Sequence, residues 1–145
     1  MKKWFFIVGF AVGTIQLSRA GDVITQDAMH LPLAARNFIN RHFEKPKISY
    51  IKIEKDWFKA KKYEVLLTDR TEIEFDSRGN WLEVDCKRKA VPATLVPGYV
   101  QAYLDEFFPE AFITQIERDK GIEVELSNDF SLKFNQKGEL VDIDD

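Results

Sequence analysis

Few side chains in this sequence are of the types that carry out acid–base, nucleophilic or metal chemistry. It has two histidines, His30 and His42, and one cysteine, Cys86. Neither histidine has an identifiable partner that would make it a general base, and Cys86 has no cysteine or histidine companion at metal-ligand spacing. Nucleophile elbows, phosphate-binding glycine loops and zinc motifs are also missing from the sequence. The sequence therefore predicts no catalytic residue, no bound metal and no cofactor.

Acidic residues are plentiful, and those at the end of the sequence are a first candidate site. Asp142, Asp144 and Asp145 carry the hard oxygen ligands that calcium prefers. The loop spacing and the glycine of a calcium-binding loop are missing, however. We therefore interpret Asp142 and Asp144 as the solvent-facing side of the last strand.

Glutamates spaced two residues apart are a second candidate site. Glu72 and Glu74 lie in one predicted strand, and Glu123 and Glu125 lie in another. Glycosidases use such carboxyl groups as an acid pair. Side chains two residues apart on a strand also share one face, so the same spacing is expected of a solvated surface. We favour the solvated surface.

The first twenty residues have the pattern of a secretory signal peptide. Two lysines precede an apolar run, and a small-residue pattern ending at Ala20 predicts cleavage before Gly21. Glycines and polar residues keep the run shorter than the ~20 apolar residues that span a bilayer. We therefore expect a periplasmic or secreted protein, with no membrane span once residues 1–20 are removed.

The charge of the mature chain argues against a nucleic-acid partner. Without the three basic residues of the leader, 18 basic residues face 24 acidic ones, and the net charge moves from −3 to −6. An acidic chain repels phosphate backbones. The basic residues at 59–62 and 87–89 form runs no longer than those of solvated loops. We expect no nucleic-acid binding.

The second half of the chain repeats the first in residue type, order and spacing. Residues 63–86 align with residues 122–145 at a constant offset of 59, and residues 32–51 align with 97–116 at an offset of 65. The difference of six residues is one insertion in the first copy, near residues 56–61. Such self-similarity predicts two repeats that share one core, with repeat one at 31–86, a linker at 87–94 and repeat two at 95–145.

Hydrophobic periodicity predicts the same elements in both repeats. Apolar residues at spacings of three and four predict one helix after Pro32 and another between Pro97 and Pro109. After each helix the period changes to two, which is typical of half-buried antiparallel strands. The expected strands lie at 47–54, 63–68, 71–76 and 80–85, then at 111–118, 122–127, 130–134 and 140–144. We predict an α+β fold of two tandem helix-plus-four-strand repeats, with a continuous antiparallel sheet and both helices on one face.

These elements carry a resemblance to a known family. Each repeat has a helix that opens in Leu-Pro or Val-Pro, a strand ending in Ile-Glu-(Lys/Arg)-Asp, a strand with Tyr-Glu-Val or Ile-Glu-Val, a polar turn, a strand of Ile/Leu-x-Phe and a glycine before the last strand. The second repeat, with the run 117–128, is the closer match. This order resembles the PepSY-like periplasmic family of Bacteroidetes, described as beta-lactamase-inhibitor-like, over nearly the whole mature chain.

The resemblance implies a tandem fold with a continuous, concave sheet and no catalytic residues. The PepSY name implies peptidase inhibition by analogy, and the inhibitor-like fold implies that another protein is held on the sheet. Fold does not entail function, so both remain analogies. The first repeat departs from the family pattern through its insertion around Trp57 and Phe58.

An asymmetry between the repeats predicts a binding surface in the first. Three of its positions are apolar or aromatic where the second repeat has Gln115, Glu125 and Leu140, and the insertion adds two more. Large exposed apolar patches mark interaction sites, although the inserted aromatic side chains would equally well fold back as a satellite core. Both interpretations stay open. The candidate partner-binding residues are Tyr50, Trp57, Phe58, Leu66 and Trp81.

We therefore predict an exported, non-enzymatic binding module that recognises a protein or peptide in the cell envelope, and inhibition of a peptidase or other enzyme is the form of recognition that the family name implies. The alternative is an envelope sensor or binder of a small molecule or metal, which would use the acidic strands as its binding surface. The sequence leaves the identity of the partner and the oligomeric state open.

Overall fold

The computed structural model describes residues 21–55 and 60–145. The predicted signal peptide and two of the predicted partner-binding residues, Trp57 and Phe58, lie outside the described residues. Residues 56–59 of the predicted insertion, which include the first lysine of the basic run 59–62, lie outside them as well.

The elements follow one another in the order expected, with one strand added at the start. The first unit contains β1 (Val23–Thr25), α1 (Leu33–His42), β2 (Ile48–Glu54), β3 (Lys62–Leu67), β4 (Glu72–Phe75) and β5 (Trp81–Asp85). The second contains α2 (Gly98–Phe107), β6 (Ile113–Asp119), β7 (Gly121–Leu126), β8 (Ser131–Asn135) and β9 (Leu140–Asp144). Short 3₁₀ turns, Ala28–His30 and Ala93–Leu95, precede the helices. A helix followed by four strands thus occurs twice.

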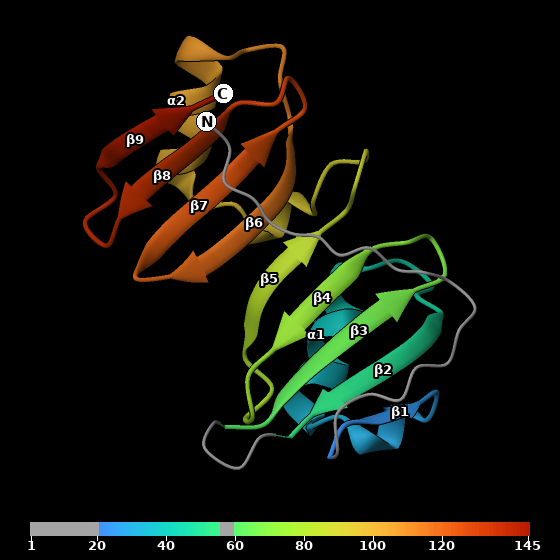
Figure 1. The fold of residues 1–145 in the computed structure, drawn as a ribbon. Helices are drawn as coiled ribbons and strands as arrows, with labels where there is room; N and C mark the ends of the chain where they lie inside the picture. Colours follow the sequence, from blue (N-terminus) through green and yellow to red (C-terminus); the bar gives the residue numbers. More distant parts are fainter. Residues whose placement is uncertain (1–20, 56–59) are drawn as a thin grey trace.

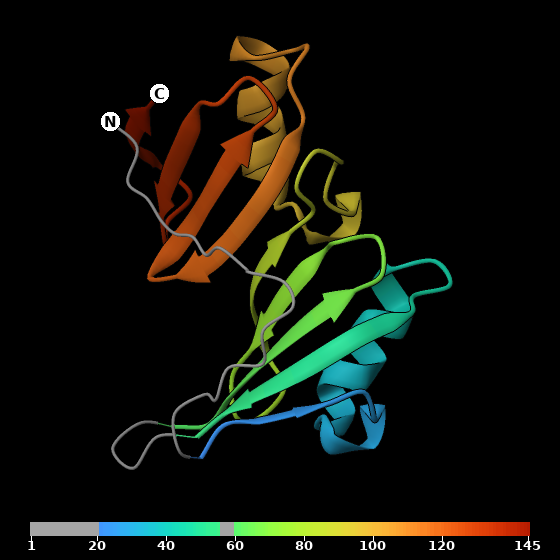
Figure 2. The same ribbon diagram turned by 45° about the vertical axis from the view of Figure 1, so that its right-hand side comes forward.

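The nine strands form one antiparallel sheet in which each strand pairs with its neighbours in the chain, from β1 to β9 (Figure 1). The two units meet where β5 pairs with β6, through Glu83 opposite Glu117, Val84 opposite Ile116 and Asp85 opposite Gln115. Both helices cover the same side of the sheet (Figure 2). The predicted α+β class, with a continuous open sheet, is confirmed. We call the side away from the helices the open face.

The core lies between the sheet and the helices because alternate residues of each strand are apolar. Ile51, Val65, Ile73 and Val84 are fully buried on the helix side, and Leu104 of α2 is 2% exposed. Burying one such side chain contributes about 1.5–3 kcal/mol. The core is therefore supplied by both units, and it fixes which strand residues remain for the open face.

A β-bulge occurs at the same place in each unit. The register shifts between Glu74 and Phe75 where β4 meets β5, and between Lys133 and Phe134 where β8 meets β9. A bulge inserts one residue and reverses the alternation of the side chains beyond it. Phe75 is buried on the helix side and pairs with Trp81, so the bulge turns Trp81 toward the helix as well.

A glycine in the hairpin turn after each bulge locates the start of a helix. Gly79 has a φ of +88°, and a Cβ there would lie 2.9 Å from the Cβ of Pro32 and the backbone nitrogen of Ala35. Gly138 occupies the equivalent turn with a φ of +83°, directly against the ring of Tyr99. Positive φ and close approach both favour glycine, so these turns set the position of each helix on the sheet.

Candidate functional site

Trp81 is half-buried and packs against the core on the helix side, so the predicted placement of its side chain on the open face is wrong. Its ring stacks on Phe38 of α1 with centroids 5.9 Å apart. The guanidinium of Arg118 covers it from the second unit, 4.3 Å from the ring centroid, and donates hydrogen bonds of 2.9 and 3.2 Å to the Trp81 carbonyl. The prediction failed because strict alternation places Trp81 on the open face, and the bulge reverses it.

Tyr50 and Leu66 do lie together on the open face. They pair across β2 and β3, and both are half-buried. Burial, Glu64 and Glu72 together raise the pKa of the Tyr50 hydroxyl, so the tyrosine stands among carboxylates rather than aromatic side chains. The described residues thus bring two of the predicted binding residues together and place Trp81 on the other side of the sheet.

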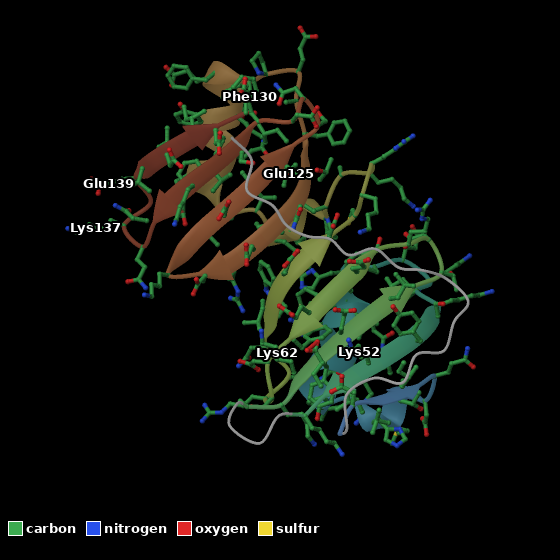
Figure 3. The ribbon with its side chains drawn as sticks, in the orientation of Figure 1. Lys52, Lys62, Glu125, Phe130, Lys137 and Glu139 are labelled. Carbon is green, nitrogen blue, oxygen red and sulfur yellow. The ribbon has the colours of Figure 1, made fainter. Side chains whose placement is uncertain are left out.

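The dominant feature of the open face is a line of five glutamates, one on each of five adjacent strands. Glu64 of β3 faces Glu74 of β4, and Glu74 faces Glu83 of β5. Across the boundary between the units Glu83 faces Glu117, and Glu117 faces Glu123. We call this set the glutamate row. Lys52 ends the row on β2, and Lys133 and Asp142 continue it on β8 and β9 (Figure 3 looks onto this face and labels Lys52).

Four carboxyl groups of the glutamate row, on β3 to β6, have pKa values raised above that of free glutamate. Burial, followed by Glu117 and Glu74, raises the pKa of Glu83 from 4.5 to about 7, although Gln115 donates a hydrogen bond to it. Burial also raises the pKa values of Glu64, Glu74 and Glu117, with neighbouring carboxylates adding to the effect. Near neutral pH the centre of the row therefore lies within its titration range.

The negative charges in a second line of residues on the open face are more closely neutralised by a lysine. Glu72 of β4 faces Asp85 of β5, and the Lys87 Nζ lies 3.1 Å from a carboxylate oxygen of Glu72 and 3.2 Å from one of Asp85. The Lys62 Nζ lies 3.9 Å from an oxygen of Glu74, at the limit of an ion pair. Basic residues thus neutralise the neighbouring line more closely than they neutralise the glutamate row.

The glutamates considered as a glycosidase pair are not brought together, in keeping with the solvated surface favoured from the sequence. Glu74 on β4 and Glu123 on β7 are separated by β5 and β6, and Glu72 is paired with Lys87. The pair that does face across the units is Glu83 and Glu117, which sequence spacing did not indicate. It lies on the outer surface of a sheet, and the nearby groove is lined by other residues.

That groove lies at the boundary between the units and has a volume of about 630 Å³. Trp81, Leu82 and Ile122 give it apolar walls, and Arg118, which lies over the Trp81 ring, also lines it. Its remaining lining residues are Asp76, Asn80, Asp119, Gly121 and Gln136. Because the Arg118 guanidinium is already held by the Trp81 ring and carbonyl, we assign the groove to packing between the units.

The histidines and the cysteine lie in surroundings typical of residues that pack or hydrogen-bond within the fold. The Nδ1 atom of His42 lies 2.8 Å from the Thr94 hydroxyl, and burial followed by Arg41 lowers the pKa of the imidazole. Cys86 is 4% exposed, and burial raises the pKa of its thiol. His30 lies at the surface near Asp27. A neutral imidazole bonded to threonine and a buried protonated thiol are consistent with roles in packing.

The acidic end of the chain belongs to the open face. Asp142 pairs in register with Lys133 of β8, and Asp144 with Ser131. Among residues 21–55 and 60–145, no three His, Cys, Asp or Glu side chains are grouped so as to hold a metal ion. In the same part of the chain no helix is long and apolar enough to cross a membrane.

Comparison with known proteins places these features in a family. Residues 61–142 match the family described as "Putative beta-lactamase-inhibitor-like, PepSY-like". No curated protein matches the chain.

Three solved structures similar to this chain come from Bacteroides. A "putative periplasmic protein of unknown function" from Bacteroides vulgatus is 44% identical, covers 86% of this chain and 100% of its own, and has a TM-score of 0.82. A "putative calcium-regulated periplasmic protein" from Bacteroides thetaiotaomicron is 42% identical, covers 86% and 97%, and has a TM-score of 0.80. A third, from the DUF2874 family of B. vulgatus, is 39% identical, covers 88% and 100%, and has a TM-score of 0.81. Matching motifs, fold and sequence identity agree, and this chain belongs to the PepSY-like, beta-lactamase-inhibitor-like family.

Proposed function

We propose that this protein is an exported, non-catalytic binding module that recognises a basic segment of a protein or peptide in the cell envelope on the open face of its sheet. The glutamate row is the observation that carries this proposal. Like charges directly opposite one another on a sheet are destabilising, by a few tenths to ~1 kcal/mol for each pair. Four such pairs follow one another from Glu64 to Glu123.

A basic ligand would remove this repulsion. Strands of a sheet lie ~4.8 Å apart, so the row from β3 to β7 is roughly 19 Å long. An extended peptide rises about 3.3 Å per residue, and a segment of about six residues therefore spans the row. The positive groups of such a segment would meet carboxylates from both units, which ties the proposed function to the continuity of the sheet.

The proposed location rests on two supports. The leader pattern that ends at Ala20 predicts export. The similar B. vulgatus and B. thetaiotaomicron structures are described as periplasmic proteins. A basic segment of another envelope protein is the partner that this location and this surface charge together favour.

The test is calorimetric titration of the mature chain with acetylated octalysine at low salt, using two double variants that each remove two negative charges. Glu117→Gln with Glu123→Gln alters the open face of the second unit. Asp105→Asn with Glu106→Gln alters the exposed surface of α2 on the opposite side. We expect the first to weaken binding by about five- to tenfold, and the second by less than about twofold, because close ion pairs outweigh distant charge.

Two results would contradict the proposal. Equal weakening by both double variants would mean that the peptide responds only to net charge. An absence of octalysine binding at low salt, where screening is smallest, would mean that the glutamate row does not bind cations of this kind.

Calcium is a second candidate ligand, because the 42% identical protein of B. thetaiotaomicron is described as putatively calcium-regulated. Carboxylates are the ligands that Ca²⁺ prefers, although those of the described residues would have to move to surround an ion. If the open face binds Ca²⁺, millimolar CaCl₂ should raise the thermal midpoint, and MgCl₂ should not. The increase should disappear in the Glu117→Gln, Glu123→Gln variant. A midpoint that does not change with CaCl₂ rules this candidate out.

A further inference from the structure

The two edges of the sheet are formed by strands of different length and exposure. At one edge β1 covers β2, with Val23 opposite Ile53 and Thr25 opposite Ile51. At the other edge β9 is the outermost strand of the described part of the chain. On β9, Val141 is 55% exposed and Ile143 is 44% exposed. An edge strand that is apolar and accessible is a template for pairing with another chain.

β5 holds the same position in the first unit as β9 does in the second, but its outer edge is covered by β6. The bulges of the two units correspond. The hydrogen bonds that close the two hairpins correspond as well. In the first unit the Asp76 amide donates to the Asn80 carbonyl, and in the second the Asn135 amide donates to the Glu139 carbonyl, both over 2.9 Å. At the offset of 59 residues, Ile143 is therefore the counterpart of Val84. Val84 pairs with Ile116 of β6 and is fully buried, whereas Ile143 is not.

The backbone of Ile143 offers hydrogen bonds outward. The Cys86 amide donates to the Thr114 carbonyl of β6 over 2.9 Å, and alternation along the strand points the Val84 amide to the same side. The Asn135 amide donates a hydrogen bond within the hairpin that joins β8 to β9, as the Asp76 amide does within the hairpin that joins β4 to β5. By this correspondence the N–H and C=O of Ile143 point away from β8, toward the open edge.

The charges on β9 disfavour a second copy of the chain as the occupant of this edge. Antiparallel pairing of β9 with itself, centred on Asp142 or on Ile143, sets Asp142 opposite the same residue or opposite Asp144, and like charges opposite one another are unfavourable. Pairing of β9 with β1, the edge strand of the first unit of another copy, would offer only the three residues Val23–Thr25, none of which is basic. Both faces of the edge are matched by a strand that places basic residues opposite Asp142 and Asp144 on the open face. Its apolar residues would lie beside Ile143 on the helix side.

We infer that β9 binds an extended segment of a partner as a tenth strand, in which basic and apolar residues alternate. The basic character of this segment rests on the proposed function, whereas its strand conformation and its place on β9 go beyond it. Main-chain hydrogen bonds supply the attachment, and the alternating side chains supply the specificity.

The test compares two substitutions of one residue, with the acetylated peptide Lys-Val-Lys-Val-Lys-Thr-Lys as the probe. Ile143→Pro removes the outward donor without breaking a bond to β8, since proline is tolerated in an edge strand when its nitrogen faces solvent. Ile143→Val keeps the donor and the apolar side chain. We expect the proline to weaken binding by at least about tenfold and the valine by less than about twofold. Amide hydrogen exchange of the unaltered protein is the second measurement, and the probe should slow it at Ile143.

Several results would overturn the inference. One is equal binding of the probe by the proline variant and the unaltered protein, and another is unchanged exchange at Ile143. If octalysine binds as tightly as the alternating probe and neither slows exchange on β9, the proposed function stands and the tenth strand is wrong. If the protein is a dimer that Ile143→Pro dissociates, the occupant is a second copy. If the alternating probe fails to bind at millimolar concentration, the inference fails whatever octalysine does.

Discussion

Replacing Trp81 by alanine should lower the free energy of unfolding by about 2–4 kcal/mol and the thermal midpoint by about 10 °C. The indole lies between Phe38 of α1 and the guanidinium of Arg118, so its removal leaves a space at the boundary between the units. A fully buried tryptophan costs about 3–5 kcal/mol when truncated to alanine, and the expected loss is smaller because Trp81 is only partly buried. Thermal or urea unfolding followed by circular dichroism measures the change.

Phe107 supplies the matched control. It is 56% exposed at the end of α2, so Phe107→Ala should cost less than about 1 kcal/mol. The assignment of Trp81 to the core would be wrong if Trp81→Ala left the midpoint unchanged while abolishing binding of octalysine. That outcome would return Trp81 to the role of an exposed partner anchor.

Replacing Glu83 by glutamine should stabilise the protein at pH 8 by about 3 kcal/mol and leave its stability nearly unchanged at pH 4. The pKa of Glu83 is about 7 in the folded protein, against an ordinary value of 4.5. Between these two values the folded state binds more protons than the unfolded state, so stability falls as the pH rises through this window. Glutamine resembles the protonated acid, keeps an oxygen that accepts the Gln115 hydrogen bond, and does not ionise.

Unfolding in urea at several pH values between 4 and 8 measures this effect, with Glu72→Gln as the control. Glu72 forms an ion pair with Lys87 at 3.1 Å, so its replacement should be neutral or slightly destabilising at pH 8. If Glu83→Gln destabilised the protein at pH 8, or if its stability relative to the unaltered protein did not change with pH, repulsion within the glutamate row would not be as we describe it.

Most of the fold could be predicted because helix and strand periods differ and are visible within each segment. The alternation around Val65 and Ile73 placed the strands of the first unit to within one or two residues. β1 was not predicted, because three residues, Val23–Thr25, are too few to show a period. Trp81 was misplaced because a bulge leaves no reliable mark in a single sequence, and one inserted residue reverses every side chain beyond it.

The glutamate row could not be predicted from one sequence for a related reason. Each strand shows its own outward glutamates, and those of β4 and β7 were noticed. Their alignment depends on the register between neighbouring strands, and hairpin lengths alone do not determine it when bulges are present. Glu83 and Glu117 lie in different units and meet only because β5 pairs with β6. The useful signal in the sequence was acidic alternation in many strands, combined with a prediction that those strands are adjacent.

The most direct test of binding on the open face is nuclear magnetic resonance of the isotope-labelled mature chain during titration with octalysine. We expect the carboxyl and amide signals of the glutamate row to shift first, with those of Glu83 and Glu117 at the boundary between the units shifting most. Signals of α1 and α2 on the other side of the sheet should move little. If the largest shifts instead map to the helices, or spread evenly over every acidic residue, the open face is not the binding surface.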